Sequence, residues 1–267
     1  MRAAFRRAIG GLLAAGVIVM HGPSKASNDR SVQGTPPVAP RLLSETGLYA
    51  GGGTAMIDPH NRPFSPQYPL WSDGAHKRRW VYLPPGATID AANIDAWEFP
   101  VGTKFWKEFV FDDRRVETRF LWRARDEGWV FASYIWNDDQ TEAQLAPAEG
   151  EPGVAEIAAG RRHSIPSIEE CKACHDSGRT EVLGFSALQL STDRDPNAIH
   201  GEPLTPEMLT LQTLLNEGVL EPTRTDLISN PPRIRAGNPR TRAMLGYLST
   251  NCGACHNGDR SLRSTCC

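Results

Sequence analysis

Two short stretches of this chain, "ECKACHD" and "NCGACHN", share one arrangement of reactive side chains. In each, two cysteines are separated by two residues and a histidine follows the second cysteine. These stretches use four of the six cysteines in 267 residues. The residues concerned are Cys171, Cys174, His175, Cys252, Cys255 and His256. Thiols and imidazoles at this spacing bind metals and cofactors, so the repeated pattern is the first feature to explain.

Cys-x-x-Cys-His is the attachment sequence for c-type haem. The two thiols add across the vinyl groups of haem, and their spacing lets one turn of chain reach both edges of the macrocycle. The next residue is then placed to ligate the iron from the proximal side. The two motifs therefore predict two covalently bound haem c groups, with His175 and His256 as the iron ligands.

Three other uses of these cysteines are weaker. Structural zinc sites usually separate their Cys-x-x-Cys pairs by about 15–20 residues, whereas 77 residues lie between Cys174 and Cys252. Thioredoxin-like redox chemistry needs a βαβ setting, and the sequence indicates none. A pair of structural disulfides gives no reason for a histidine after both pairs. Haem attachment is therefore the preferred interpretation.

The sixth ligands of the two irons stay open at this point. Met208 and Met244 are candidates, because methionine is a common distal ligand in electron carriers. Both lie on expected apolar helix stripes, where methionine is more often core filler. Weaker candidates are histidines in expected loops or in the β-rich region, namely His60, His76, His163 and His200.

The N-terminus has the composition of a secretory signal peptide. A basic "MRAAFRR" precedes thirteen apolar residues, and small residues around Ala26 provide a cleavage site. We expect residues 1–26 to be the signal peptide and 27–41 a flexible lead-in, with the mature protein periplasmic or otherwise exported. The alternative is an uncleaved membrane anchor, but thirteen apolar residues are fewer than the ~20 that span a bilayer. No other segment is expected to span a membrane, so we expect no integral membrane span in the mature chain.

The remaining composition names no partner. A formal net charge of −2 and 40% hydrophobic residues describe an ordinary globular protein. Because there is no basic excess, we expect no nucleic-acid partner. The sequence contains no catalytic triad, phosphate loop or metalloprotease motif, so hydrolase chemistry has no support.

Residues 42–150 are expected to form a β-rich domain, an antiparallel meander or sandwich. All seven tryptophans fall here. Alternating polarity over 104–136, with turn residues near 112–113 and 126–128, predicts three antiparallel strands, and 78–86 predicts another. Aromatic residues alternating along strands are usually the core of the sheet itself. A sugar-binding face that uses nearby aspartates is the alternative, with Asp73, Asp138 and Asp139 as its acidic residues.

Residues 146–162 are rich in Ala, Gly, Glu and Pro, and we expect a boundary or a long exposed loop there. Helix signals follow. Ser167 and Glu170 form a capping box that opens a short helix into the first motif. Two later helices are expected from Thr205–Pro206 to Gly218 and from Asn238–Pro239 to the second motif. The second of these helices is expected to bury Ala243, Met244, Tyr247 and Leu248.

These signals predict an α+β protein in which the β-rich domain precedes an α-helical, cytochrome c-like region. We expect residues 151–235 to form the first haem-binding region and 236–267 the second. Only eleven residues follow His256, and "GDRSLRSTCC" has no helical stripe. Either earlier parts of the chain cover the second haem or the second region is truncated. We expect truncation or a frame error, rather than thiol chemistry at Cys266–Cys267.

Several phrases outside the haem motifs add a resemblance. In order they are "LSETGLY", "YPLWSDGAHKRRWVYLPPG", "WEFPVGTKFWKEF", "RVETRFLWR", "SYIWNDDQTEA", "SIPSIEECKACH", "EVLGFSALQL" and "LGYLSTNCGACH". Together they resemble a bacterial family of exported di-haem c-type cytochromes with a β-rich N-terminal region. The resemblance covers about Leu42 to Asn257, and it implies covalent haem at both motifs and a periplasmic place in a redox chain. After Asn257 the chain departs from the family pattern, in which more haem-binding sequence is expected.

The expected function is that of a periplasmic di-haem c-type cytochrome carrying single electrons between redox partner proteins, rather than an enzyme. Two alternatives stay open. One is a haem enzyme, peroxidase-like or acting on a small substrate, that uses one haem as an electron relay. The other is a glycan-binding β module with accessory haems.

Overall fold

The computed structural model describes residues 37–126, 128–176, 180–254 and 256. The predicted signal peptide, residues 27–36 of the lead-in, Cys255 and the predicted truncated end from Asn257 onward lie outside the described residues.

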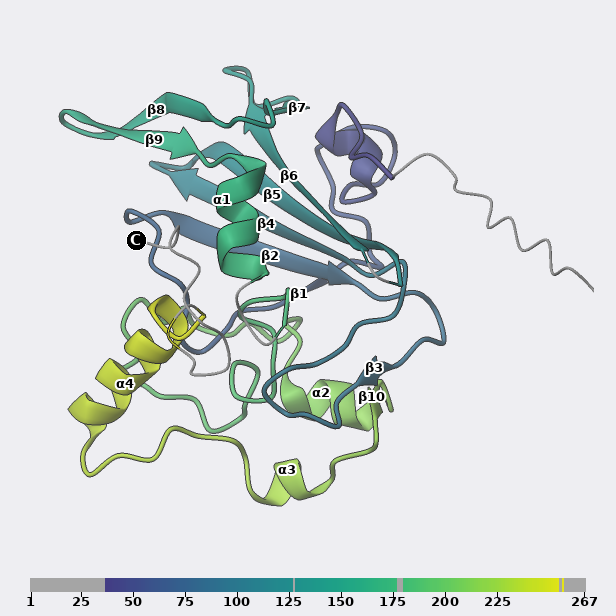
Figure 1. Ribbon diagram of the computed structural model, residues 1–267, viewed down its shortest axis with the longest axis vertical. Helices are drawn as coiled ribbons and strands as arrows, with labels where there is room; N and C mark the ends of the chain where they lie inside the picture. The colour runs from purple at the N-terminus through teal and green to yellow at the C-terminus, as the bar shows by residue number, and fades with distance from the viewer. Residues whose placement is uncertain (1–36, 127, 177–179, 255, 257–267) are drawn as a thin grey trace, which may run out of the picture. The chain divides into compact units, whose positions relative to one another are not determined.

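A six-stranded antiparallel sheet, in the order β1-β2-β4-β5-β6-β7, positions the other described elements (Figure 1). Its strands are β1 (Arg62–Pro63), β2 (His76–Tyr82), β4 (Lys104–Phe111), β5 (Arg114–Arg125), β6 (Gly128–Trp136) and β7 (Ala143–Leu145). The predicted meander corresponds to β4, β5 and β6, and the predicted additional strand is β2. The β-rich part of the predicted fold is therefore confirmed.

One face of this sheet is aromatic and is covered by the start of the described chain. Trp80, Trp106 and Phe120 occupy directly opposed positions on three neighbouring strands. Leu43, in the 3₁₀ helix η1 (Leu43–Thr46), packs in the same cluster. The Trp106 indole donates a hydrogen bond of 2.9 Å to the Thr46 hydroxyl, so the buried indole N–H is satisfied.

The opposite face begins with apolar side chains and packs against the later chain. Val81 and Phe105 contact a core that also contains Phe185 and Leu211. Phe185 and Phe105 meet edge-to-face with ring centroids 5.3 Å apart. Residues on both sides of position 150 thus share one core. The predicted domain boundaries themselves stay predictions.

The predicted loop at 146–162 is instead largely a hairpin. Strands β8 (Glu151–Ala158) and β9 (Arg161–Ile165) pair antiparallel. The hydrogen bonds between the two strands satisfy the backbone polar groups of this segment. Its Ala- and Gly-rich sequence did not indicate strands. A second small pair is parallel, joining β3 (Ile89–Asp90) to β10 (Leu220–Glu221).

The described helices are α1 (Ile168–His175), α2 (Leu211–Asn216), α3 (Asp226–Ser229) and α4 (Pro239–Asn251). α1 and α4 begin where their caps predict. α2 begins later than the predicted Pro206, because Thr205 and Met208 form a turn and Thr210 caps the helix by accepting a hydrogen bond from the Thr213 amide. No cytochrome-like helical region is visible among the described residues, and none of their helices has the length and apolar character to cross a bilayer.

α4 buries only part of the predicted stripe: Ala243 is buried as predicted and Tyr247 is half-buried. Arg242, Ala243 and Gly246 are buried, whereas Met244 and Leu248 are 47% and 44% exposed. The reason is that α4 approaches the ring of Tyr68 closely at Gly246, and Arg242 makes an ion pair of 3.2 Å with Asp193. A small residue and a salt bridge, rather than large apolar side chains, therefore hold this helix.

We predict that Gly246→Ala destabilises the protein. A Cβ at this position would lie 2.1 Å from Tyr68 Cε1. Overpacking of this kind costs about 1–3 kcal/mol, although the higher helix propensity of alanine acts in the opposite direction. Urea unfolding measures the change. Gly237→Ala is the control, because a Cβ there meets nothing within 4 Å. If the cost persists in a Tyr68→Ala background, the proposed clash is not its cause.

Candidate functional site

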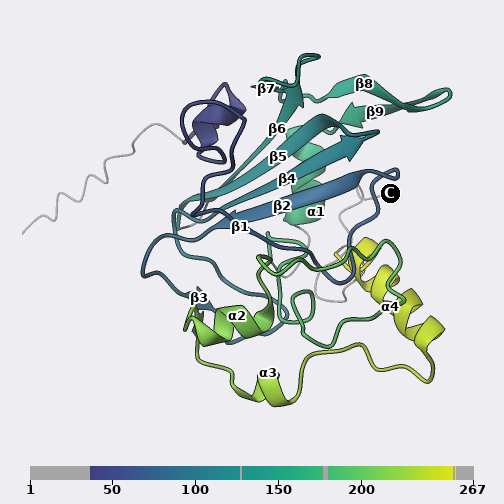
Figure 2. The same ribbon diagram turned by 180° about the vertical axis from the view of Figure 1, so that it is seen from behind.

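Helix α1 carries the first motif and lies across one face of the sheet, packing against β6 (Figures 1 and 2). Its start is fixed by the capping box, in which the Ser167 hydroxyl accepts from the Glu170 amide at 3.2 Å and the Glu170 carboxylate accepts from the Ser167 amide at 2.8 Å. The Ile168 amide also donates to the Ala148 carbonyl at 2.8 Å. These contacts orient the motif toward the sheet.

Cys171, Cys174 and His175 line a cavity of about 550 Å³ between α1 and the sheet. Side chains from β2, β4, β5 and β6 form its floor, and residues of β9, of three loops and of the end of α4 complete the wall. Apolar and aromatic groups dominate this lining, with a few charged groups among them. Size and lining are those of a pocket for a small molecule or cofactor.

His175 is held in one orientation. Its Nδ1 donates a hydrogen bond to the Glu181 carbonyl, and its ring lies 5.1 Å from that of Phe131, centroid to centroid. Burial lowers the pKa of His175, which favours the neutral ring. With the proton on Nδ1, Nε2 carries the lone pair that a metal needs. Metal-binding histidines commonly donate the proton of their other ring nitrogen to a backbone carbonyl in this way, which fixes the orientation of the ring.

The second motif is placed differently. Cys252 and His256 are exposed, and Cys255 lies outside the described residues. Thr250, at the end of α4, lines the cavity. The adjacent Asn251 accepts a hydrogen bond of 2.8 Å from the Trp71 amide. The structure thus brings the helix that leads to the second motif to the edge of the cavity, but it does not enclose Cys252 or His256 there.

The methionines proposed as distal ligands do not line the cavity. Met208 is half-buried in the turn before α2, and Met244 is exposed on α4. Met56, the third methionine in the described part of the chain, is 64% exposed.

Of the four candidate histidines, His163 alone lines the cavity. It lies in strand β9 rather than in the predicted loop. Its side chain is buried, and its Nε2 donates a hydrogen bond of 2.8 Å to the Glu117 carboxylate. His200 is exposed, with its ring 6.3 Å from that of Tyr247. His60 pairs with Asp58 on the surface, and His76 is exposed on β2.

A group of charged residues on the sheet floor was missed by the sequence analysis. Arg79 on β2, Lys107 on β4 and Arg119 on β5 all line the cavity. They were not among the site residues predicted from the sequence. They share the strand parity of Val81, Phe105 and Leu121, which pack in or against a core. That shared parity is the signal that could have revealed an interior position.

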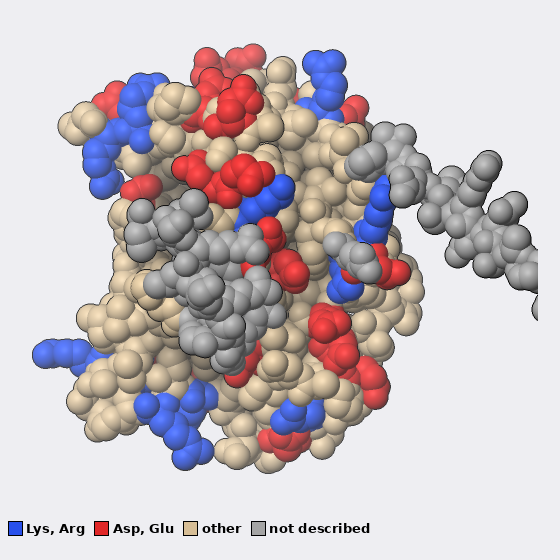
Figure 3. All heavy atoms as spheres, viewed as in Figure 1, with Lys and Arg blue, Asp and Glu red and all other residues tan. Residues whose placement is uncertain are grey.

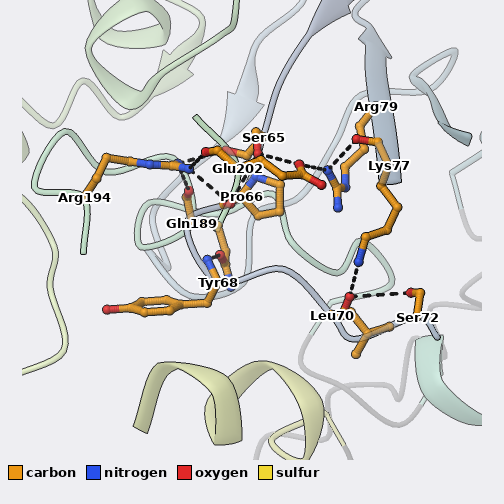
Figure 4. Close-up of polar contacts among 10 residues, drawn as sticks. All are labelled: Ser65, Pro66, Tyr68, Leu70, Ser72, Lys77, Arg79, Gln189, Arg194 and Glu202. Atoms are coloured by element: carbon orange, nitrogen blue, oxygen red, sulfur yellow. Dashed lines mark hydrogen bonds and ion pairs between the residues drawn. The ribbon is translucent and has the colours of Figure 1, made fainter. Parts of the chain in front are cut away.

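Two of these cations have carboxylate partners. Arg119 Nε donates a hydrogen bond of 2.6 Å to one carboxylate oxygen of Glu117, and the other oxygen accepts a hydrogen bond from His163. Burial alone raises the pKa of Glu117, but the charge of Arg119 and the hydrogen bonds from His163 and Arg119 outweigh it and lower the pKa to about 2. Arg79 Nη1 donates a hydrogen bond of 2.8 Å to the Glu202 carboxylate, which also accepts a hydrogen bond from the Ser65 hydroxyl (Figure 4).

The tryptophans mainly form core, as preferred from the sequence. Trp80, Trp97, Trp106 and Trp136 are buried, and Trp122 and Trp129 pack against the two cores. Trp71 is 45% exposed. Trp71 and Asp73 line the cavity, while Asp138 lies 3.6 Å from Arg114 at the surface. The described residues do not bring exposed tryptophans together as a sugar-binding face requires.

Comparisons with protein-family models, curated proteins and solved structures find no match to this chain. Among the described residues, no group of three or more His, Cys, Asp or Glu side chains is arranged to hold a metal ion by itself.

We predict that Glu117→Gln destabilises the protein by about 3–5 kcal/mol near neutral pH, because it leaves Arg119 without its buried partner. The pKa of Glu117 is lowered from 4.5 to about 2, so its stabilisation is present above about pH 4.5 and is lost as the pH falls through about 2. Urea unfolding between pH 7 and pH 2 should therefore show a difference from wild type that shrinks across that window.

Glu169→Gln is the control for this measurement. Glu169 pairs with Lys172 at 3.2 Å on the surface of α1. Exposed pairs contribute less than about 1 kcal/mol. A Glu117→Gln effect as small as that of the control, or one independent of pH, would contradict the proposed role of the buried pair.

Proposed function

We propose that this protein is an exported di-haem c-type cytochrome that carries single electrons between redox partner proteins. The observation that carries the proposal is the placement of the first motif. Cys171, Cys174 and His175 line one cavity of about 550 Å³, and His175 Nδ1 donates a hydrogen bond to a backbone carbonyl. Cysteine pair, oriented imidazole and cavity together fit a covalently attached haem better than a disulfide or a structural zinc site.

The residues around the motif suit this group. Phe109 and Phe131 give an aromatic floor for a flat macrocycle, and Arg79, Lys107 and Arg119 give cations for its carboxylates. Cys171 and Cys174 would form the thioethers and His175 would ligate the iron through Nε2. When bound, haem supplies a one-electron redox centre whose potential depends on burial, axial ligation and nearby charge. The chain itself fixes the imidazole through the hydrogen bond from His175 Nδ1 to the Glu181 carbonyl.

The second haem is proposed at Cys252, Cys255 and His256 from the motif. Support from the fold is indirect: Thr250 reaches the cavity of the first motif, so the two sites would lie near each other. Acidic side chains gather over α1 in Figure 3, and its first turn exposes Glu169 and Glu170. A redox partner docking beside the first haem would therefore present a basic surface.

The stoichiometry of covalent haem tests this function. The full chain is expressed with a periplasmic c-haem maturation system, and the pyridine haemochrome is measured against protein concentration. We expect two haems per chain for the wild type. Cys171→Ser/Cys174→Ser and Cys252→Ser/Cys255→Ser should each reduce this value to one. No covalent haem in the wild type would refute the proposal, and one haem lost only with the first pair would limit it to a single site.

One observation favours a second candidate, a haem oxidoreductase acting on a small molecule. None of the methionines in the described residues lines the cavity, and His163, which does, is hydrogen-bonded to Glu117. An iron held by His175 would then keep an exchangeable distal position, and an open position admits a small molecule.

Spectra of a single-haem protein distinguish the two candidates. In the Cys252→Ser/Cys255→Ser background, the oxidised haem should be high-spin and should bind cyanide or imidazole readily. Met208→Leu and Met244→Leu should leave this spectrum unchanged. A low-spin spectrum that one of these substitutions converts to high-spin would show a methionine ligand and exclude the open position.

A further inference from the structure

We propose that Lys107 binds a carboxylate inside the cavity, and that this carboxylate is a propionate of the haem attached at Cys171 and Cys174. The inference rests on the proposed function and assigns a role to a residue that haem attachment itself does not require. It follows from three features of the sheet floor: a row of like charges, one cation of that row without a carboxylate partner, and the half-buried position of that cation in the cavity wall.

The first feature is the register of three neighbouring strands. Arg79 on β2 pairs with Lys107 on β4, and Lys107 pairs with Arg119 on β5. Directly opposed side chains have Cβ atoms about 4.5–5.5 Å apart, and like charges at such positions destabilise a sheet. Three cations in one cross-strand row therefore need compensating negative charge.

The second feature is that this compensation is incomplete. Arg79 and Arg119, the outer cations of the row, are paired with Glu202 and Glu117 at 2.8 and 2.6 Å. Lys107, between them, makes no ion pair or hydrogen bond with any residue that the structure describes. Its ammonium instead lies 4.8 Å from the centroid of the Phe109 ring. The row is one carboxylate short.

The third feature is the half-buried position of Lys107 in the cavity wall. Burial, together with the charges of Arg119, Arg79 and Lys77, lowers the pKa of Lys107 well below its usual value. A charged ammonium in such a place is unfavourable unless a negative group joins it. Because Lys107 lines the cavity, that group can come from a ligand in the cavity.

Other lysines of the same sheet show that this arrangement is specific. Lys77, two residues before Arg79 on β2, donates to the Leu70 carbonyl. Lys104 is on β4 with Lys107 but on the other face, where its ammonium donates 2.8 Å to the Thr46 carbonyl. Both ammonium groups are satisfied by the protein. Lys107 differs from them in facing the cavity without such an acceptor.

The cavity also indicates what kind of molecule brings the carboxylate. Phe105, Phe109 and Phe131 line it beside the cationic row. A ligand that fits both parts has a large apolar body and an anionic edge. Haem, an apolar macrocycle with two propionates, has this chemistry, and the thiols and imidazole of the first motif line the same cavity. A free small carboxylate is the other source of the same group.

The test uses the full chain with haem attached, in the Cys252→Ser/Cys255→Ser background, and compares Lys107→Met with Lys104→Met. Both substitutions remove one ammonium from β4, but only the first removes it from the cavity. We expect Lys107→Met to lower the reduction potential of the remaining haem and to shift its propionate bending band in the resonance Raman spectrum. Lys104→Met should leave both unchanged. Lys107→Arg, which keeps the charge, should retain a potential close to that of the unsubstituted background.

Each outcome bears on a separate claim. If haem is attached but Lys107→Met and Lys104→Met give the same potential and the same Raman band, the role of Lys107 is wrong and the proposed function stands. If no haem is attached at Cys171 and Cys174, the proposed function fails first. If succinate shifts the spectrum of the unsubstituted background and Lys107→Met abolishes that shift, Lys107 binds a free carboxylate and the propionate assignment is overturned.

Discussion

The register that sets Trp80 opposite Trp106 and Trp106 opposite Phe120 is the constraint on which the rest of the structure depends. Successive side chains of a strand point to opposite faces, so fixing this aromatic row also fixes the next row, Arg79, Lys107 and Arg119, on the other side. A slip of one residue would turn the cations into the aromatic core and the indoles into the cavity. The packing of one face thereby determines the electrostatics of the other.

Helix α1 depends on that floor. It has eight residues, too few to be stable alone in water, and none of them is fully buried. Its capping box, its bond to Ala148 and the bond from His175 to the Glu181 carbonyl hold it at both ends. The motif is therefore presented by local hydrogen bonds on a sheet whose register has already determined what faces it.

The sequence predicted those parts of the structure in which one local signal decides the outcome. Ser167 with Glu170, and Asn238 with Pro239, mark the starts of α1 and α4 because a cap satisfies its own helix. The β4–β6 meander follows from alternation and turn residues. Tertiary contacts decided the rest. Met208 precedes α2 because Thr210, rather than Thr205, caps that helix, and Met244 is exposed because Gly246 and Arg242 make the contacts of α4.

The candidate site shows the same division. The motif at Cys171 could be found from spacing alone, and the histidine beside it follows from the same pattern. That Arg119 and Lys107 face the interior had one signal, the parity that they share with Leu121 and Phe105, but alternation alone says that two faces differ and not which one is covered. His163 was assigned to a loop because nothing in "GRRHSIP" indicates a strand, and it became visible as a buried partner only through its contact with Glu117.

The segments that form the walls of the cavity are also synthesised one after another along the chain. The walls come from the loop around Phe64 and Trp71, from the sheet floor, from α1 and finally from Thr250, which is the last of these residues to be synthesised. A group bonded to both thiols, as proposed, would lie against the sheet floor and be bordered by Thr250. The proposed group would thus be a structural part of the protein as well as a functional one, because the sheet, α1 and α4 would all border the space that it fills.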